Sequence, residues 1–386
     1  LVTGEQVVVN NDILYLKLEH DVHYENISIP REGFKSMIRR FGALLWSFYS
    51  YKKVLNLIKN HEPDIIHFHT TIPYLSFSVM YAAYISKTPV VQSLHNGRWL
   101  CLEGGYFRNN TYCNDCVGTN GWLGLKRGCG HGHLISLILF MNNYIVRKFG
   151  FLFKYVSKFI AVSEFVREQH IKSGFPNDKI VVRNNGFDFT INKDKFINDS
   201  WIKREGIVFA GRISIAKGAL VMKYLISKLN CPIKIIGNGP ELQMLKQYCV
   251  KNNYNHVIFF GKIKNDKTIK IIKSSVLTVV PSQCGDSFPT VALESISVRT
   301  PVVASNLGGL PDLINTSGGG FIVQYDDNDK FLKTVQYLLD NKITAKSIGD
   351  KGKIFIEQNV SLEKQGLELT EIYKQVVIEH QLNLEC

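Results

Sequence analysis

The chain contains the stretch Asp286-Ser-Phe-Pro-Thr-Val-Ala-Leu-Glu294, in which seven residues separate two carboxylates. Proline has no N–H to leave unpaired, so Pro289 suits the first turn of a helix that continues through Val291 and Glu294. The free N–H groups and the positive dipole end of that helix then lie between the two carboxylates. This arrangement fits a ligand with phosphates at one end and hydroxyl groups at the other, such as a nucleotide-sugar.

Short apolar segments alternate with helical patterns on both sides of this stretch. Continuous apolar strands between helices indicate parallel sheets that are covered on both faces. We expect an α/β protein with two doubly wound Rossmann-like domains, residues 1–190 and 191–360, and a C-terminal helix in 361–386 that packs back on the first domain. The predicted strands are Asp64–Phe68, Val90–Leu94, Lys158–Val162, Ile207–Ala210, Ile233–Ile236, Val257–Phe260, Leu277–Val280 and Pro301–Ala304.

Glycine-rich loops follow several of these strands. Gly211 and Arg212 follow Ile207–Ala210, and Lys217 comes five residues after the arginine. Arginine grips phosphate in a bidentate way and lysine adds a point charge, so this loop could clamp an anion. Gly239 lies in the tight turn after Ile233–Ile236, where the backbone can approach a ligand closely. Each loop alone could be an ordinary solvent-facing turn, but together they indicate one ligand crevice at the carboxyl ends of the strands.

One histidine stands at a similar position in the first half of the chain. His95 directly follows Val90–Leu94, so we expect it at a strand's carboxyl end. A lone histidine there is equally compatible with a structural role, its ring nitrogens satisfied by hydrogen bonds.

Four cysteines precede two histidines in a segment without clear periodicity. Cys113 and Cys116 form a C-x2-C pair, with Cys101 upstream and Cys129 downstream. This spacing can hold one structural Zn²⁺ in a tetrahedral shell. Reduced buried thiols or a labile disulfide are the alternatives.

The composition limits the partners and the compartment. The chain has 386 residues and a formal net charge of +13, which favours anionic partners. No stretch reaches the length of a transmembrane helix, and no secretory signal is visible. Eight cysteines without an export signal indicate reduced thiols, so we expect a cytoplasmic protein.

Two segments are basic, aromatic and free of acidic residues. One runs from Cys116 to Ser163 and the other from Lys35 to Lys59. Both resemble amphipathic helices that lie on an anionic bilayer, so we expect peripheral contact with the inner face of the plasma membrane. The alternative is a solvated cationic face over buried aromatic side chains.

Beyond these patterns, the chain resembles the retaining glycosyltransferases of family 4, which have the GT-B fold with two Rossmann-like domains facing across a cleft. The resemblance is carried by the paired carboxylates of 286–294, the loop 211–218, the segments 163–166 and 185–188, and the motif at 63–69. The segment 94–101 with the following Cys pair resembles a bacterial branch that has the same Cys cluster. The family's first strand has no counterpart at residues 1–9, so the N-terminal domain is expected to lack it.

The resemblance implies a role for each site residue. Arg212 and Lys217 would neutralise the donor diphosphate, Gly211 and Gly239 would shape its loops, and the N–H groups of Thr290 and Val291 would cap a phosphate. Glu294 would hold the ribose hydroxyls, Asp286 would contact the transferred sugar, and His95 would touch that sugar from the other domain. Because fixed cations and a helix dipole would handle the leaving-group charge, no catalytic metal is expected.

The leading interpretation is therefore a transferase that moves a sugar from a UDP- or GDP-sugar to a lipid-linked glycan in bacterial surface polysaccharide biosynthesis. A same-fold enzyme with a small-molecule acceptor is one alternative. A catalytically weak glycan- or membrane-binding partner is another, since Asp286 is one methylene shorter than the Glu usual at this position in the family. Nucleic acid is not an expected partner, because no nucleic-acid module is visible.

Overall fold

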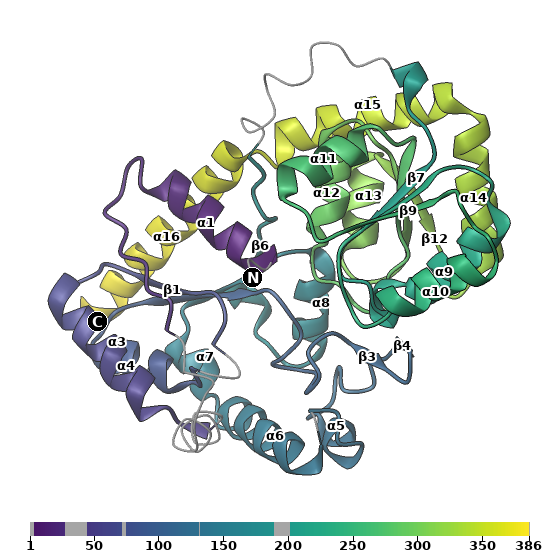
Figure 1. Cartoon of the computed structure of the whole chain (residues 1–386). Coiled ribbons are helices and arrows are strands. Elements are labelled where there is room, and N and C mark those ends of the chain that lie inside the picture. Colours follow the sequence, from purple (N-terminus) through teal and green to yellow (C-terminus); the bar gives the residue numbers. More distant parts are fainter. Residues whose placement is uncertain (1–3, 28–44, 72–74, 131, 189–200, 386) are drawn as a thin grey trace. The chain divides into compact units, whose positions relative to one another are not determined.

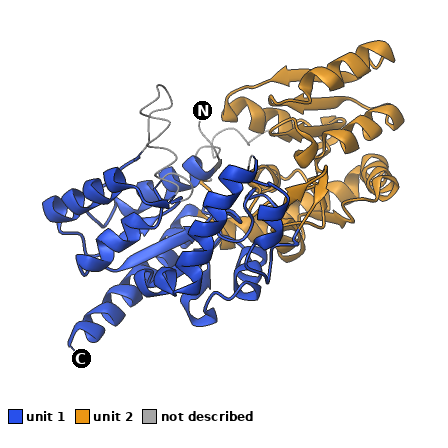
Figure 2. Ribbon diagram, turned by 90° about the horizontal axis from the view of Figure 1, so that it is seen from below, with its two compact units in different colours: residues 1–106, 114–186, 362–386 blue, residues 107–113, 187–361 orange. Residues whose placement is uncertain are grey.

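The structure is a computed structural model that describes residues 4–27, 45–71, 75–130, 132–188 and 201–385. It divides into two compact units (Figure 2). Unit 1 consists of residues 1–106, 114–186 and 362–386, and unit 2 of residues 107–113 and 187–361. The C-terminal helix α16 (Leu362–Glu385) therefore belongs to unit 1, and the short hairpin of β3 (Phe107–Arg108) and β4 (Thr111–Tyr112) to unit 2.

Unit 1 is built on a parallel sheet with the strand order β1-β2-β5-β6. Helices α1 and α16 pack together against this sheet, where Leu16, Val91, Ile160, Leu369 and Val376 form one buried cluster. The strands are β1 (Ile66–Phe68), β2 (Val90–Leu94), β5 (Lys158–Ala161) and β6 (Ile180–Val182). The remaining helices are α1 (Gly4–Leu16), α3 (Phe48–His61), α4 (Ser78–Ile85), α5 (Trp122–Lys126), α6 (His133–Lys148), α7 (Phe151–Tyr155) and α8 (Glu164–Lys172).

Unit 2 contains a six-stranded parallel sheet with the order β12-β11-β10-β7-β8-β9 (Figure 1). Apolar clusters on both faces of the sheet bury its strands under helices, as expected for a doubly wound domain. The strands are β7 (Ile207–Ala210), β8 (Ile233–Ile236), β9 (Val257–Gly261), β10 (Leu277–Val280), β11 (Val302–Ser305) and β12 (Gly320–Val323). The helices are α9 (Ala219–Lys228), α10 (Leu242–Lys251), α11 (Asn265–Lys273), α12 (Thr290–Ser297), α13 (Leu310–Ser317), α14 (Asn328–Asp340) and α15 (Lys342–Asn359).

Two parallel sheets in two units confirm the predicted α/β class with Rossmann-like domains. The strands predicted at β2, β7, β8 and β10 agree residue for residue with the structure. In the described part of the chain, no helix is both long and apolar enough to cross a membrane. Residues 35–44 of the second basic segment lie outside the described residues.

Candidate active site

The order of strands in unit 2 fixes where a ligand can bind. From β7 the chain continues to β8 on one side of the sheet, whereas β10 pairs with β7 on the other side. The loops after β7 and β10 therefore diverge at a topological switch point, which is the place where open α/β sheets bind their ligands. The segment 211–218 follows β7, and the stretch 286–294 comprises the end of the loop after β10 and the first residues of α12.

Glycines let the neighbouring strand ends pack closely. The Gly211 N–H donates to the Ile236 carbonyl over 3.0 Å, and a Cβ on Gly237 would meet the Gly211 carbonyl oxygen at 1.8 Å. A Cβ on Gly239 would meet the Ile213 carbonyl oxygen at 2.2 Å. The surface formed by Gly211 and Gly239 is therefore backbone rather than side chain, as a close approach to a ligand requires.

The loops after β7 and β10 are joined by an ion pair. The Lys217 ammonium contacts the Asp286 carboxylate, whose other oxygen accepts a hydrogen bond of 2.8 Å from Ser282. Burial by itself lowers the pKa of Lys217, but the adjacent Asp286 carboxylate outweighs burial, so the pKa of the lysine is raised. Lys217 is therefore a fixed positive charge at the switch point.

The Asp286 backbone also fixes the next loop. Its carbonyl accepts a hydrogen bond of 2.7 Å from Gly309 N–H, and a Cβ on Gly308 would meet the same oxygen at 2.0 Å. The loops after β10 and β11 are thereby locked together, which holds the Asp286 side chain in place beside Lys217.

Two further groups at this edge are available to an anion. Arg212 is exposed, and within the described residues no carboxylate pairs with it. Helix α12 begins at Thr290 after Pro289, and no side chain caps its N-terminus. The first N–H groups of α12, including those of Thr290 and Val291, lack intrahelical acceptors, so they present partial positive charge.

Glu294 lies farther along α12 and is mostly surrounded by protein. Burial raises the pKa of its carboxyl group to about 7, although a hydrogen bond with Asn265 at the start of α11 opposes this shift. A carboxyl group with this pKa exchanges between acid and carboxylate near neutral pH, and both forms can hydrogen-bond hydroxyl groups.

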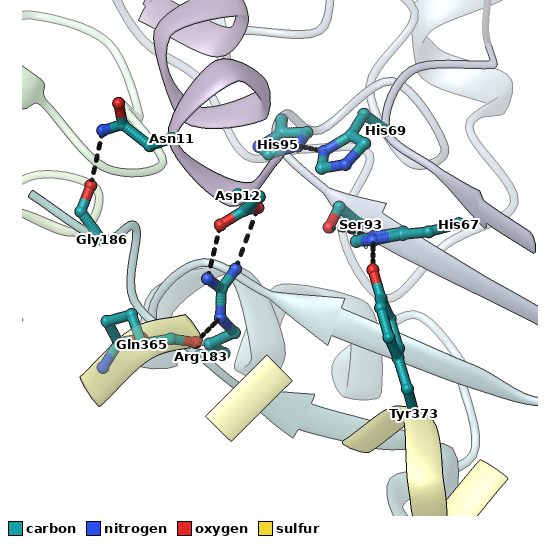
Figure 3. Close-up of polar contacts among 10 residues, drawn as sticks. All are labelled: Asn11, Asp12, His67, His69, Ser93, His95, Arg183, Gly186, Gln365 and Tyr373. Atoms are coloured by element: carbon teal, nitrogen blue, oxygen red, sulfur yellow. Dashed lines mark hydrogen bonds and ion pairs between the residues drawn. The ribbon is translucent and has the colours of Figure 1, made fainter. Parts of the chain in front are cut away.

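In unit 1, His95 follows β2 as the sequence predicted and belongs to a cluster of histidines (Figure 3). Its Nε2 lies 2.9 Å from Nδ1 of His69, and the two rings are stacked. His67 contacts the Tyr373 hydroxyl at 2.6 Å and the Ser93 hydroxyl at 2.8 Å. Burial lowers the pKa of both His69 and His95 to about 3, so His95 acts as a neutral hydrogen-bonding group.

A buried ion pair stands beside this cluster (Figure 3). Arg183 donates two hydrogen bonds to Asp12, of 3.2 and 2.6 Å, and a third of 2.8 Å to the Gln365 carbonyl. Both charged side chains are 3% exposed. The pair links α1, the end of β6 and α16, and a cavity of about 910 Å³ beside it is lined in part by His67 and His69.

The four cysteines of the predicted zinc site do not form a metal centre among the described residues. No group of three or more His, Cys, Asp or Glu side chains is placed there to hold an ion, and His131 lies outside that part of the chain. Among the described residues, none of Cys101, Cys113, Cys116 and Cys129 forms a disulfide. The structure thus gives the zinc prediction no support.

Comparisons with known proteins agree with the fold. Residues 13–190 match the family model described as Glycosyltransferase Family 4, and residues 191–355 match that of Glycosyl transferases group 1. An uncharacterized glycosyltransferase of Methanocaldococcus jannaschii is 23% identical, over 87% of this chain and 90% of its own length. A GDP-mannose-dependent monoacylated α-(1-6)-phosphatidylinositol monomannoside mannosyltransferase of Corynebacterium glutamicum is 23% identical, over 62% of each chain.

Among solved structures, that of Anabaena HepE in complex with UDP and glucose aligns with a TM-score of 0.69. The alignment covers 97% of each chain, with 17% sequence identity. At this level of identity the similarity shows the fold.

Sequence reasoning placed the residues of unit 2 at one sheet edge but missed their neighbours. Ser282 and Asn265 hold the two carboxylates, and neither stands in a pattern that would single it out. His69 had a signal, because it directly follows β1, which pairs with β2, and His95 directly follows β2.

Proposed function

Because the chain belongs to the glycosyltransferases of family 4, we propose that it is a retaining transferase that moves a sugar from a UDP- or GDP-sugar to a lipid-linked glycan. We place this reaction at the inner face of the bacterial plasma membrane, in surface polysaccharide biosynthesis. The alignment with a UDP complex supports the nucleotide donor, and the mannosyltransferase that acts on a phosphatidylinositol glycolipid supports a lipid-linked acceptor.

The observation that carries the proposal is the convergence of positive charge at the switch point of unit 2. Lys217, Arg212 and the uncapped N-terminus of α12 surround the ends of β7 and β10. A diphosphate bound there would be held by charge-assisted hydrogen bonds, each worth about 1.5–3 kcal/mol. The same groups would stabilise the diphosphate as it leaves the sugar.

The family membership implies the course of the proposed reaction. The bond between the anomeric carbon and the diphosphate oxygen breaks, and the acceptor oxygen forms its new bond on the same face of the sugar. The acceptor proton passes to the departing phosphate oxygen. Asp286 would contact the sugar near the reacting carbon, Glu294 would hold the ribose hydroxyls, and His95 would hydrogen-bond the sugar in its neutral form.

The experiment that tests this function is a panel of UDP- and GDP-sugars, read first by thermal shift and then by transfer of labelled sugar. A bound donor raises the melting temperature by mass action. R212A should weaken donor binding about 10–150-fold, because one charge-assisted hydrogen bond worth about 1.5–3 kcal/mol is lost. K251A, at an exposed lysine in α10, is the matched control and should bind donor as the wild type does.

The outcome of the panel also decides between the alternatives. Release of free sugar at the rate of donor consumption would indicate a small-molecule acceptor such as water. Membrane or glycan binding that survives R212A and E294A, without transfer by the wild type, would indicate the non-catalytic partner. Absence of a thermal shift with every donor would refute the proposal itself.

A further inference from the structure

Helix α6 of unit 1 exposes a stripe of apolar side chains and buries several polar ones. Leu134, Leu137 and Met141 are 65%, 41% and 41% exposed. Their spacing of three and four residues places them along one stripe of the helix. The buried side of the same helix holds Leu139 and Val146 together with the polar residues Ser136, Asn142 and Asn143. A helix whose outer side faces water is expected to carry polar residues on that side.

Two of the buried polar side chains form hydrogen bonds to the backbone of unit 1. Asn143 donates a hydrogen bond of 2.7 Å to the Arg98 carbonyl, and Ser136 accepts one of 2.8 Å from Gly130 N–H. These contacts fix which side of α6 faces the protein. The apolar stripe is therefore held outward and cannot turn inward by rotation of the helix.

Two exposed aromatic residues belong to the segments that flank α6 in the sequence. Trp122 at the start of α5 is 55% exposed, and Phe149 after the end of α6 is 64% exposed. Helices α5 and α6 contact each other, and the Trp122 ring packs edge-on against Phe140 of α6. We call the five residues Trp122, Leu134, Leu137, Met141 and Phe149 the α6 face.

Within the segment 116–163, which contains the α6 face, all Asp, Glu, Lys and Arg charge is positive, and Asp115 just before it pairs with Arg127. The sequence from Cys116 to Ser163 contains no Asp or Glu. Lys126, in the last turn of α5, and Lys148, in the last turn of α6, are both exposed. Lys148 lies over the Tyr144 ring at 5.1 Å, so its stem runs along the aromatic surface while the ammonium stays at the periphery.

We propose that the α6 face is the surface by which unit 1 inserts into the headgroup region of an anionic bilayer. An interfacial helix buries its apolar side about 5–10 Å deep, with leucines and tryptophan in the acyl boundary and lysines at the phosphates. The proposal rests on the membrane location in the proposed function and names the residues that would produce it. Charge complementarity selects an anionic lipid surface over a second copy of this basic segment, since two such surfaces repel each other.

The experiment measures binding of the whole chain to vesicles with and without phosphatidylserine, by co-sedimentation. The triple variant L134Q/L137Q/M141Q should bind phosphatidylserine vesicles at least about tenfold more weakly, because binding scales with the apolar area inserted. L220Q/V250Q/I343Q is the matched control, since it alters three exposed apolar residues on helices of unit 2. It should bind as the wild type does.

The lysines test the electrostatic part of the proposal separately. K126Q/K148Q should weaken binding to phosphatidylserine vesicles about 25-fold, since each lysine near an anionic surface contributes about 1 kcal/mol. Vesicles of phosphatidylcholine alone should not distinguish this variant from the wild type. Because every substituted side chain is exposed, the variants should fold, and an unchanged donor-induced thermal shift would show that they do.

Three results would overturn the proposal. The wild type could fail to bind anionic vesicles, the α6 triple variant could bind them as tightly as the wild type, or the control triple variant could lose binding equally. Self-association of the wild type that disappears in the α6 variant, without vesicle binding, would make this face a subunit contact instead. If no donor raised the melting temperature of the wild type, the donor site would be refuted. The vesicle results would still test the α6 face by themselves.

Discussion

The pKa of Glu294 leads to a prediction about stability that can be worked out in advance. Burial raises this pKa to about 7 from the ordinary 4.5. A carboxyl group with a raised pKa makes the folded state bind more protons than the unfolded state between these two values. The free energy of unfolding therefore falls as the pH rises through this window. Across the whole window, the free energy of unfolding falls by at most about 3 kcal/mol, since one pKa unit is worth about 1.4 kcal/mol.

The substitution E294Q removes this titration and keeps the shape of the side chain. The free energy of unfolding of the variant minus that of the wild type should be about 2 kcal/mol larger at about pH 8 than at about pH 5.5. The reason is that only the wild type carries a desolvated charge at the higher pH. The measurement is urea unfolding at both pH values, followed by circular dichroism, without nucleotide. E363Q, at an exposed glutamate of α16, is the control.

A stability difference between E294Q and the wild type that is the same at both pH values would refute this reasoning. It would mean that the Glu294 carboxyl group is as well solvated as in the unfolded chain. The same result would leave the donor-binding proposal open to test, because a solvated carboxylate can still hydrogen-bond ribose hydroxyls.

Four other substitutions or treatments have defined outcomes. K217A should weaken UDP or GDP binding, measured by calorimetry, more than R212A does, because it leaves the Asp286 charge facing the diphosphate; equal losses would contradict the role given to the ion pair. D12N should lower the free energy of unfolding by about 3–5 kcal/mol, since it leaves the Arg183 guanidinium buried without its partner, and a urea midpoint near the wild-type value would count against this. H95F should lower kcat and leave nucleotide binding unchanged, whereas a change only in nucleotide affinity would reassign the histidine. Treatment with EDTA should not change the transfer rate, because cations of the protein face the leaving group; a loss restored by Mg²⁺ would show a metal requirement.

The sequence predicted the strands well wherever they are continuous and apolar. β2, β7 and β10 are buried along their whole length and β8 in all but Lys234, so each reads as a mostly apolar run with at most two polar residues. Two edge strands, β6 and β12, were missed, whereas the opposite edge strands β1 and β9 were predicted. β12 begins at Gly320, and β6 has only three residues, so neither shows a pattern that stands out from a loop.

Helix α1 shows how tertiary contacts decide a local structure. It contains Val7, Val8 and Val9, whose β-branched side chains weakly favour strands. The segment is helical in the structure, where Val8, Val9 and Leu16 are buried and α1 packs along α16. Packing against a helix at the far end of the chain outweighs the intrinsic preference of these residues.

In the candidate site, too, some features depend on local sequence and others on tertiary contacts. The sequence by itself determined which residue types stand at the strand ends of unit 2, because strand, glycine turn and helix start are local features. Only the tertiary structure decided that Lys217 contacts Asp286 across 69 residues of sequence, that His69 lies against His95, and that Glu294 is desolvated. Likewise, the sequence showed that residues 116–163 are basic and aromatic, but the contacts of Asn143 and Ser136 decided which side of α6 faces outward. Contacts between distant parts of the chain depend on how elements pack, and that packing is not encoded in any short stretch of residues.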